Sequence, residues 1–238
     1  MSEERASVPE EGLHAERVDS RMAGNSPASR LFYRIARFIL CGGIRSYTRM
    51  IVIGGENIPT DGPFVLAPTH RSYIDTPIAG VLYKRRMRFM GKGEMWHSKW
   101  FGWIISALGA FPVRRGQADR EALTRCIEVL ESGEPLVLFP EGERKDGPVI
   151  QPLFDGAAYV AARGKGPIIP VGIGGSAQVM PRHAKFVYPH RTCVIVGEPI
   201  EVERSESGRA SRRAVHEVTE KLHAELQRLF DEASARVS

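Results

Sequence analysis

Apolar residues recur along this chain in short runs that alternate with longer stretches of helical periodicity. Short runs bounded by Gly, Pro or charged residues predict β-strands over residues 50–53, 64–67, 87–90, 110–113, 135–139, 168–173 and 192–196. Apolar residues at helical spacing predict helices over 75–83, 95–107, 119–131, 152–163 and 207–235. This alternation predicts a single α/β domain with a mixed central sheet flanked by helices.

The N-terminal region differs from the rest of the chain. Residues 1–29 are polar, rich in Glu, Ser, Arg and Gly, and without apolar periodicity, which predicts a disordered segment before a domain over 30–238. Residues 30–48 place apolar residues at helical spacing among arginines, so an N-terminal amphipathic helix is expected. Two interpretations remain open: a core-packing helix with a solvated basic face, or a membrane-surface helix.

A second segment with possible membrane contact contains every tryptophan of the chain. Trp96, Trp100 and Trp103 lie within eight positions of one another. Tryptophan favours the membrane–water boundary, because its ring is apolar while its N–H needs a polar partner. Core packing explains one such residue well and three less well. No run of about eighteen apolar residues occurs, so no transmembrane helix is expected.

Charge and cysteine content narrow the class of protein. The formal net charge of +5 favours anionic partners, such as a membrane surface or phosphorylated metabolites. No motif for reading nucleic acid occurs, and the aromatic residues are not interleaved with a basic stripe, so no nucleic-acid partner is expected. The three cysteines are widely spaced, which fits a reducing compartment and argues against a metal cluster.

A histidine and an aspartate, His70 and Asp75, follow the predicted strand 64–67. Five positions turn by about 140° on an ideal helix, so the two residues would not share a helix face. At a strand-to-helix corner, however, the carboxylate can hold the imidazole in one tautomer and stabilise its protonated form. This arrangement supplies the base and its orienting partner, with no obvious protein nucleophile nearby, and a substrate hydroxyl is a candidate for the attacking group.

Three further segments follow in order: Gly109–Arg115, Leu138–Arg144 and Pro167–Val171. Together with the His70–Asp75 block they resemble the four sequence blocks of the glycerophospholipid acyltransferase family, whose members include 1-acylglycerol-3-phosphate acyltransferases. The resemblance covers residues 54–200, and the Phe-Pro-Glu-Gly and His-x4-Asp blocks are its most specific parts.

The resemblance implies an O-acyltransferase that moves a fatty acyl group from acyl-CoA or acyl carrier protein to 1-acylglycerol-3-phosphate, giving phosphatidic acid in phospholipid biosynthesis. It implies His70 as general base and Asp75 as its orienter, with no cofactor. His70, Asp75 and Glu141 form a conceivable metal-ligand set, but no second histidine has ligand-like spacing and the neighbours are basic, so no metal is expected. The expected partners are a lysophospholipid, an acyl thioester and a membrane surface. The expected location is peripheral or monotopic, on the cytoplasmic face of a bacterial plasma membrane.

The same resemblance implies a substrate-binding group formed by Arg115, Arg144, Glu141, Gly142 and Ser72. Arg115 and Arg144 would supply cations for a phosphate. Glu141 would accept a bond from the acceptor hydroxyl or anchor Arg115 and nearby N–H groups, and Gly142 would allow a close approach or an unusual φ. Two alternatives remain: the same chemistry on glycerol-3-phosphate, another lysophospholipid or a glycolipid, or a non-catalytic lipid-binding protein.

Overall fold

The structure is a computed structural model that describes residues 27–113, 120–203 and 210–237. Some predictions fall outside these residues. They are Arg115, nearly all of the segment predicted to be disordered, and residues 207–209 at the start of the predicted C-terminal helix.

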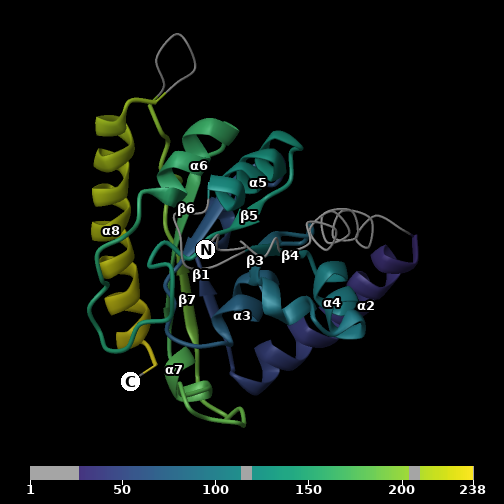
Figure 1. Cartoon of the computed structure of the whole chain (residues 1–238). Coiled ribbons are helices and arrows are strands. Elements are labelled where there is room, and N and C mark those ends of the chain that lie inside the picture. Colours follow the sequence, from purple (N-terminus) through teal and green to yellow (C-terminus); the bar gives the residue numbers. More distant parts are fainter. Residues whose placement is uncertain (1–26, 114–119, 204–209, 238) are drawn as a thin grey trace, which may run out of the picture.

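A seven-stranded sheet forms the centre of the molecule, in the order β1-β7-β6-β2-β5-β3-β4 (Figure 1). The strands β6, β2, β5, β3 and β4 are mutually parallel, whereas β7 pairs antiparallel with β6 and parallel with β1. The sheet is therefore mixed, as the sequence predicted. The strand bounds are β1 (Ile51–Ile53), β2 (Val65–Pro68), β3 (Arg88–Lys92), β4 (Ala110–Val113), β5 (Leu136–Val137), β6 (Ile168–Gly174) and β7 (Cys193–Val196).

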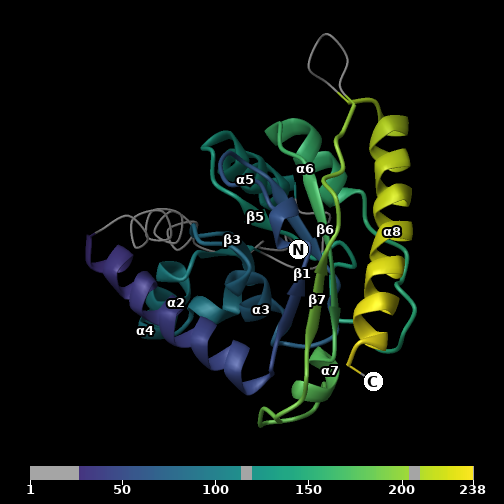
Figure 2. The ribbon, with the colours of Figure 1, turned by 180° about the vertical axis from the view of Figure 1, so that it is seen from behind.

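Helices cover both faces of the sheet, as two views from opposite sides show (Figures 1 and 2). Their bounds are α2 (Pro27–Tyr47), α3 (Asp75–Val81), α4 (Lys99–Ala107), α5 (Arg120–Glu131), α6 (Gly156–Gly164), α7 (Ser176–Val179) and α8 (Arg212–Ala235), with 3-10 turns η1 (Gly55–Asn57) and η2 (Gly93–Trp96). None of the helices in the described part of the chain is long and apolar enough to cross a membrane.

Alternating side chains of the central strands build two separate cores. Val65 and Ala67 of β2 are fully buried in the core that α5, α6 and α8 share. Phe64 and Leu66 point the other way, into the core that α3 closes. The two-residue period of a strand produces this division, and burial on both faces explains why the run 64–67 is continuously apolar.

Helix α8 lies directly on β6 because two glycines allow it. A Cβ at Gly172 would stand 2.4 Å from the backbone of Leu229, and one at Gly174 would stand 2.4 Å from the backbone of Ala233. Real Cβ atoms do not approach so closely, so a side chain at either position would push α8 off the sheet. This contact fixes the position of α8 beside the candidate site described below.

Helix α2 is attached to the body of the protein by a few specific contacts. Nη2 of Arg37 donates to the backbone oxygen of Tyr83 over 2.6 Å, and the rings of Phe32 and Trp103 lie 5.2 Å apart. Arg37 therefore anchors the helix to the body of the protein. Much of the apolar side of the helix remains exposed, with Phe38 81% and Ile39 63% accessible.

Three predicted boundaries shift for identifiable reasons. Strand β5 spans only Leu136–Val137; the N–H of Leu138 still donates to the oxygen of Leu66 at 2.9 Å, and Pro140 has no N–H to extend the pairing further. Helix α6 begins at Gly156 rather than at residue 152, since the backbone N–H of Phe154 donates instead to the oxygen of Pro140. Helix α4 begins at Lys99, where the hydroxyl of Ser98 accepts from the N–H of Phe101 and caps the helix.

Candidate active site

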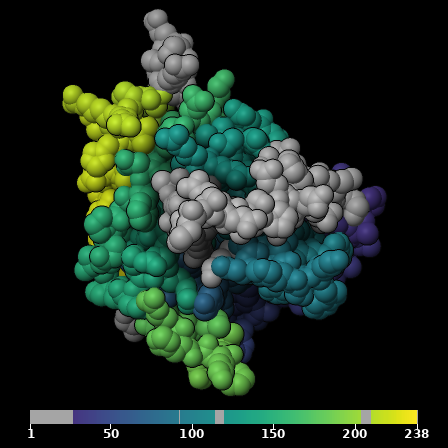
Figure 3. Space-filling model, viewed as in Figure 1, coloured from purple at the N-terminus to yellow at the C-terminus, as the bar shows by residue number. Residues whose placement is uncertain are grey.

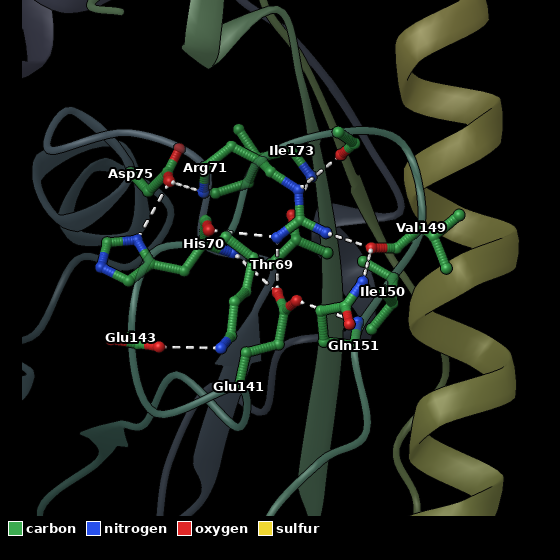
Figure 4. Close-up of polar contacts among 12 residues, drawn as sticks. Thr69, His70, Arg71, Asp75, Glu141, Glu143, Val149, Ile150, Gln151 and Ile173 are labelled. Carbon is green, nitrogen blue, oxygen red and sulfur yellow. Dashed lines mark hydrogen bonds and ion pairs between the residues drawn. The ribbon is translucent and has the colours of Figure 1, made fainter. Parts of the chain in front are cut away.

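Three of the four blocks identified in the sequence, those that contain His70, Glu141 and Val171, meet at one edge of the sheet. Strand β2 lies between β6 and β5 and is parallel to both, so the carboxyl ends of all three strands lie together. His70 follows β2 and Glu141 follows β5, and the two residues are in hydrogen-bond contact (Figure 4). The carboxyl edge of parallel strands is the usual place for ligand sites in α/β proteins, because loops there converge.

The imidazole of His70 is held by the carboxylate of Asp75. Nδ1 of His70 lies 3.1 Å from Oδ2 of Asp75, which is fully buried in the first turn of α3. The same oxygen accepts from the backbone N–H groups of Arg71 and Ser72, each at 2.6 Å. A carboxylate is an acceptor, so the geometry assigns the proton of a neutral His70 to Nδ1 and leaves Nε2 unprotonated. The predicted strand-to-helix corner is therefore present.

The ring of His70 is also fixed by an aromatic neighbour. It stacks on Phe139 with the centroids 3.9 Å apart and the planes 20° from parallel. The His70 side chain is 13% exposed. A ring packed on one side and hydrogen-bonded at one nitrogen has little rotational freedom, so Nε2 keeps one direction.

A buried ion pair joins the His70 segment to the Glu141 segment. Nη1 of Arg71 lies 2.7 Å from Oε1 of Glu141, and the two side chains are 3% and 0% exposed. The second oxygen of Glu141 accepts from the backbone N–H of Gln151 at 3.2 Å. Both carboxylate oxygens are thus occupied within the protein. The arginine that Glu141 anchors here is Arg71, a residue that the sequence interpretation did not single out.

The remaining donors of Arg71 reach the loop that follows Glu141. Its Nε donates to the oxygen of Gly147 and its Nη2 to the oxygen of Val149, at 3.1 and 3.2 Å. From the other side, α8 holds this loop: the side-chain oxygen of Gln227 accepts from the N–H of Ile150 at 2.8 Å. The ring of Phe230 lies 4.9 Å from the guanidinium carbon. Arg71 therefore links α8 and the loop 147–151 to the turn that carries His70.

Gly142 adopts the conformation that the sequence anticipated. Its φ is +74°, and a Cβ there would meet the ring of Phe154 at 2.8 Å. Any other residue would suffer both backbone strain and a steric clash, so glycine is required to turn the chain after Glu141.

Arg144 presents an unpaired donor beside the site. Its guanidinium carbon lies 3.4 Å from the centre of the Tyr73 ring. Its Nη1 is buried and has no hydrogen-bond partner among the residues that the structure describes. The next residue, Lys145, donates its backbone N–H to the oxygen of His70 at 2.9 Å, which places Arg144 next to the turn that carries His70. An unpaired buried guanidinium nitrogen is costly, and an anionic ligand would satisfy it.

The structure places the other predicted binding residues differently from one another. Ser72 is fully buried, and its hydroxyl donates to the backbone oxygen of Met180 at 2.7 Å, so it fastens the turn to the segment after α7. Arg115 lies outside the described residues, and its predicted contact with phosphate stays a prediction. The fourth block, Ile169 to Val171, forms part of β6 and is buried, as expected.

A signal for Arg71 was present in the sequence. It lies between His70 and Ser72 in one of the most specific blocks, directly after a buried strand. A cationic side chain at such a position needs an anionic or hydrogen-bonding partner. Its partner is far away in sequence, at Glu141, and so could not be assigned from spacing. Within the described part of the chain, no group of three or more His, Cys, Asp and Glu residues has the geometry of a metal site.

Comparison with known proteins shows the family to which this chain belongs. A family model described as "Acyltransferase" matches residues 49–174, a range that includes both His70 and Glu141. The chain belongs to the acyltransferase family. This acyltransferase is 32% identical over 163 residues to a Bacillus subtilis protein named 1-acyl-sn-glycerol-3-phosphate acyltransferase, covering 68% of this chain and 75% of that protein.

Two further matches extend the comparison. A chloroplastic Brassica napus protein named 1-acyl-sn-glycerol-3-phosphate acyltransferase BAT2 is 29% identical over 173 residues, which cover 70% of this acyltransferase and 49% of the plant protein. The crystal structure of the Thermotoga maritima 1-acyl-sn-glycerophosphate (LPA) acyltransferase, PlsC, superposes with a TM-score of 0.71 at 22% identity. That match covers 94% of this chain and 90% of the other, and it shows that the two share a fold.

Proposed function

We propose that this acyltransferase moves a fatty acyl group from acyl-CoA or acyl carrier protein to the free hydroxyl of 1-acylglycerol-3-phosphate, giving phosphatidic acid. The Bacillus and Brassica relatives carry names that specify this acceptor. The observation that carries the proposal is the buried Asp75 carboxylate on Nδ1 of His70, which leaves Nε2 free to act as a base.

In the proposed reaction, Nε2 of His70 takes the proton of the acceptor hydroxyl as its oxygen attacks the thioester carbonyl carbon. The resulting imidazolium donates through Nδ1 to Asp75, which stabilises its positive charge. Collapse of the tetrahedral intermediate breaks the carbon–sulfur bond, and the imidazolium returns the proton to the departing thiolate. A thiol leaves readily, so the acyl group passes directly to the acceptor without an acyl-enzyme.

The acceptor phosphate is proposed to bind the arginines beside the site. Arg144 has a buried Nη1 without a partner among the described residues, and a planar guanidinium suits a phosphate monoester. Arg115 is proposed as a second cation. Glu141 does not approach a phosphate in this scheme; it holds Arg71 and thereby fixes the loop from which Arg144 extends.

Contact with a bilayer is proposed through α2 and α4, since the lipid acceptor lies in the membrane. Exposed apolar side chains continue from Phe38 and Ile39 on α2 to Trp100 and Trp103 on α4, which are 74% and 42% accessible. Exposed aromatic and apolar groups beside arginines are typical of a membrane-surface helix. The protein is accordingly proposed to bind peripherally to the cytoplasmic face of the membrane.

A panel of acceptors with purified protein tests the choice of substrate. The proposal predicts that radiolabelled acyl-CoA yields phosphatidic acid from 1-acylglycerol-3-phosphate, with little product from lysophosphatidylcholine or a lysoglycolipid. Preference for an acceptor without a phosphate monoester would reject the role given to Arg144. Binding of lipid without any acyl transfer, from either CoA or acyl carrier protein, would reject the reaction itself.

A further inference from the structure

The loop between α7 and β7 combines exposed aromatic side chains with positive charge. At its tip, Phe186, Val187 and Tyr188 are consecutive and are 73%, 43% and 51% exposed. Single exposed apolar residues are ordinary on protein surfaces, but three in succession form a patch that needs an explanation. We refer to residues 181–191 as the basic aromatic loop.

The flanks of this loop are basic on both sides of the tip. Arg182, His183, Lys185 and Arg191 are exposed, and the sequence contains no Asp or Glu between Pro181 and Arg191. Arg182 forms an ion pair of 2.5 Å with Asp146. Lys185 directly precedes the apolar tip in the sequence. Apolar side chains bordered by cations suit a lipid bilayer that has an apolar interior and anionic headgroups.

The backbone of the loop is held in place while its tip faces outward. The N–H of Tyr188 donates to the oxygen of Val179 at 2.7 Å, and the hydroxyl of Tyr47 donates to the oxygen of Val187 at 2.9 Å. Tyr47 is the last residue of α2, so the loop is continuous with the exposed apolar helix proposed above to touch the bilayer. Both ribbon views place the end of α2 beside the loop (Figures 1 and 2).

The loop also adjoins the catalytic turn. Its base is fastened by the bond from Ser72 to Met180, and Arg182 pairs with Asp146 in the segment after Glu141. In the space-filling view the light-green segment that contains the loop protrudes at the bottom edge, away from α6 at the top (Figure 3). The base of the loop is therefore tied to the turn that carries His70 and to the segment after Glu141.

We propose that the basic aromatic loop is a second membrane contact, which binds anionic phospholipid and holds the His70 edge of the sheet against the bilayer. The inference rests on the proposed function, because only a lipid acceptor requires this placement. Phe186 and Tyr188 enter the interfacial region while Lys185 and Arg191 pair with phosphate groups. The successive apolar side chains favour a bilayer over an acidic protein, which would use the cations alone.

The test uses the full chain and flotation with two kinds of vesicle, phosphatidylcholine alone and phosphatidylcholine mixed with phosphatidylglycerol. The variants are Phe186→Ser and Lys185→Glu. Matched controls are Tyr159→Ser on α6 and Lys221→Glu on α8, both exposed and far from the loop. We expect each loop variant to bind the anionic vesicles about tenfold more weakly, and the controls to bind like the unmodified protein.

A second readout separates membrane binding from other roles. Acyl transfer to a short-chain, monomeric 1-acylglycerol-3-phosphate is expected to be unchanged in the loop variants, while transfer to the same acceptor embedded in vesicles falls. Equal vesicle binding by loop variants and controls would overturn the proposal. So would loss of activity on the monomeric acceptor, or a defect confined to acyl carrier protein as donor. Loop-dependent vesicle binding without any acyl transfer would reject the proposed reaction and leave the membrane contact standing.

Discussion

Nη1 of Arg71 donates a hydrogen bond to Oε1 of Glu141 across 2.7 Å, and the two side chains are 3% and 0% exposed. This pair connects two sequence blocks that lie 70 positions apart. On one side, the N–H of Arg71 supports Asp75; on the other, its guanidinium supports the loop 147–151. The pair therefore fixes the turn that carries His70 to the loop that follows Glu141.

Replacing Arg71 by alanine is expected to destabilise the protein by about 3–5 kcal/mol, because it leaves the Glu141 carboxylate buried and unpaired. Chemical denaturation measures this loss. Arg213→Ala provides the control, since that arginine pairs with Glu217 on the exposed face of α8 and its removal should cost far less stability. Similar losses in the two variants would show that the buried pair contributes little.

Asp75→Asn is expected to lower kcat by a factor of about 100 to 10,000 while preserving the fold. An asparagine occupies the same volume, but it cannot stabilise the imidazolium as a carboxylate does. Steady-state kinetics, together with circular dichroism of the variant, measure both effects. Retention of more than half of kcat in a folded Asp75→Asn protein would remove Asp75 from the mechanism.

Arg144→Ala is expected to raise the KM for a phosphorylated acceptor by about tenfold or more, as loss of a charge-assisted hydrogen bond predicts, with a smaller change in kcat. Arg163→Ala on α6, which removes an exposed cation elsewhere, is the control. The effect should be specific to acceptors that carry a phosphate monoester. An equal rise in KM for an uncharged acceptor would indicate a general disturbance of the site.

Gly142→Ala is expected to lose activity as well as about 1–3 kcal/mol of stability, because φ is positive and the ring of Phe154 blocks a Cβ. Gly133 is a matched control: its φ is +76°, and nothing lies within 4 Å of the position of a Cβ. Gly133→Ala should share the backbone strain but keep activity. Equal activity of the two variants, measured as thiol release, would contradict a role for the Gly142 turn.

The thiols of the three cysteines differ in accessibility, and an accessible protein thiol reacts with the reagent that measures thiol release. Burial raises the pKa of Cys126 to about 12 and also raises the pKa of Cys193. A thiol with a raised pKa stays protonated and unreactive at neutral pH. For Cys126, the stability linked to the neutral thiol is lost as the pH rises from about 9 towards its pKa of about 12. We expect Ellman's reagent at pH 8 to label Cys41 in the native protein and all three cysteines after denaturation. Rapid native labelling of Cys126 would contradict the packing.

Much of the architecture could be predicted because burial on two faces produces continuous apolar strands such as 64–67. The corner formed by His70 and Asp75 was also predictable, since both residues lie within one short segment. The partner of Glu141 was not, because the contact with Arg71 depends on how β2 and β5 pair in the sheet. The anchoring role of Arg37 was hidden for a similar reason: its acceptors, the oxygens of Val81 and Tyr83, are backbone atoms.

In the proposed reaction, Nε2 of His70, oriented through Nδ1 by Asp75, removes the proton of an acceptor hydroxyl. The most direct measurement is free-thiol release from palmitoyl-CoA by purified protein, with and without 1-acylglycerol-3-phosphate, for the unmodified chain and for a folded His70→Ala variant. If His70 is the general base, thiol release requires the acceptor and disappears in the variant. Release that persists without His70 at a comparable rate would contradict that role.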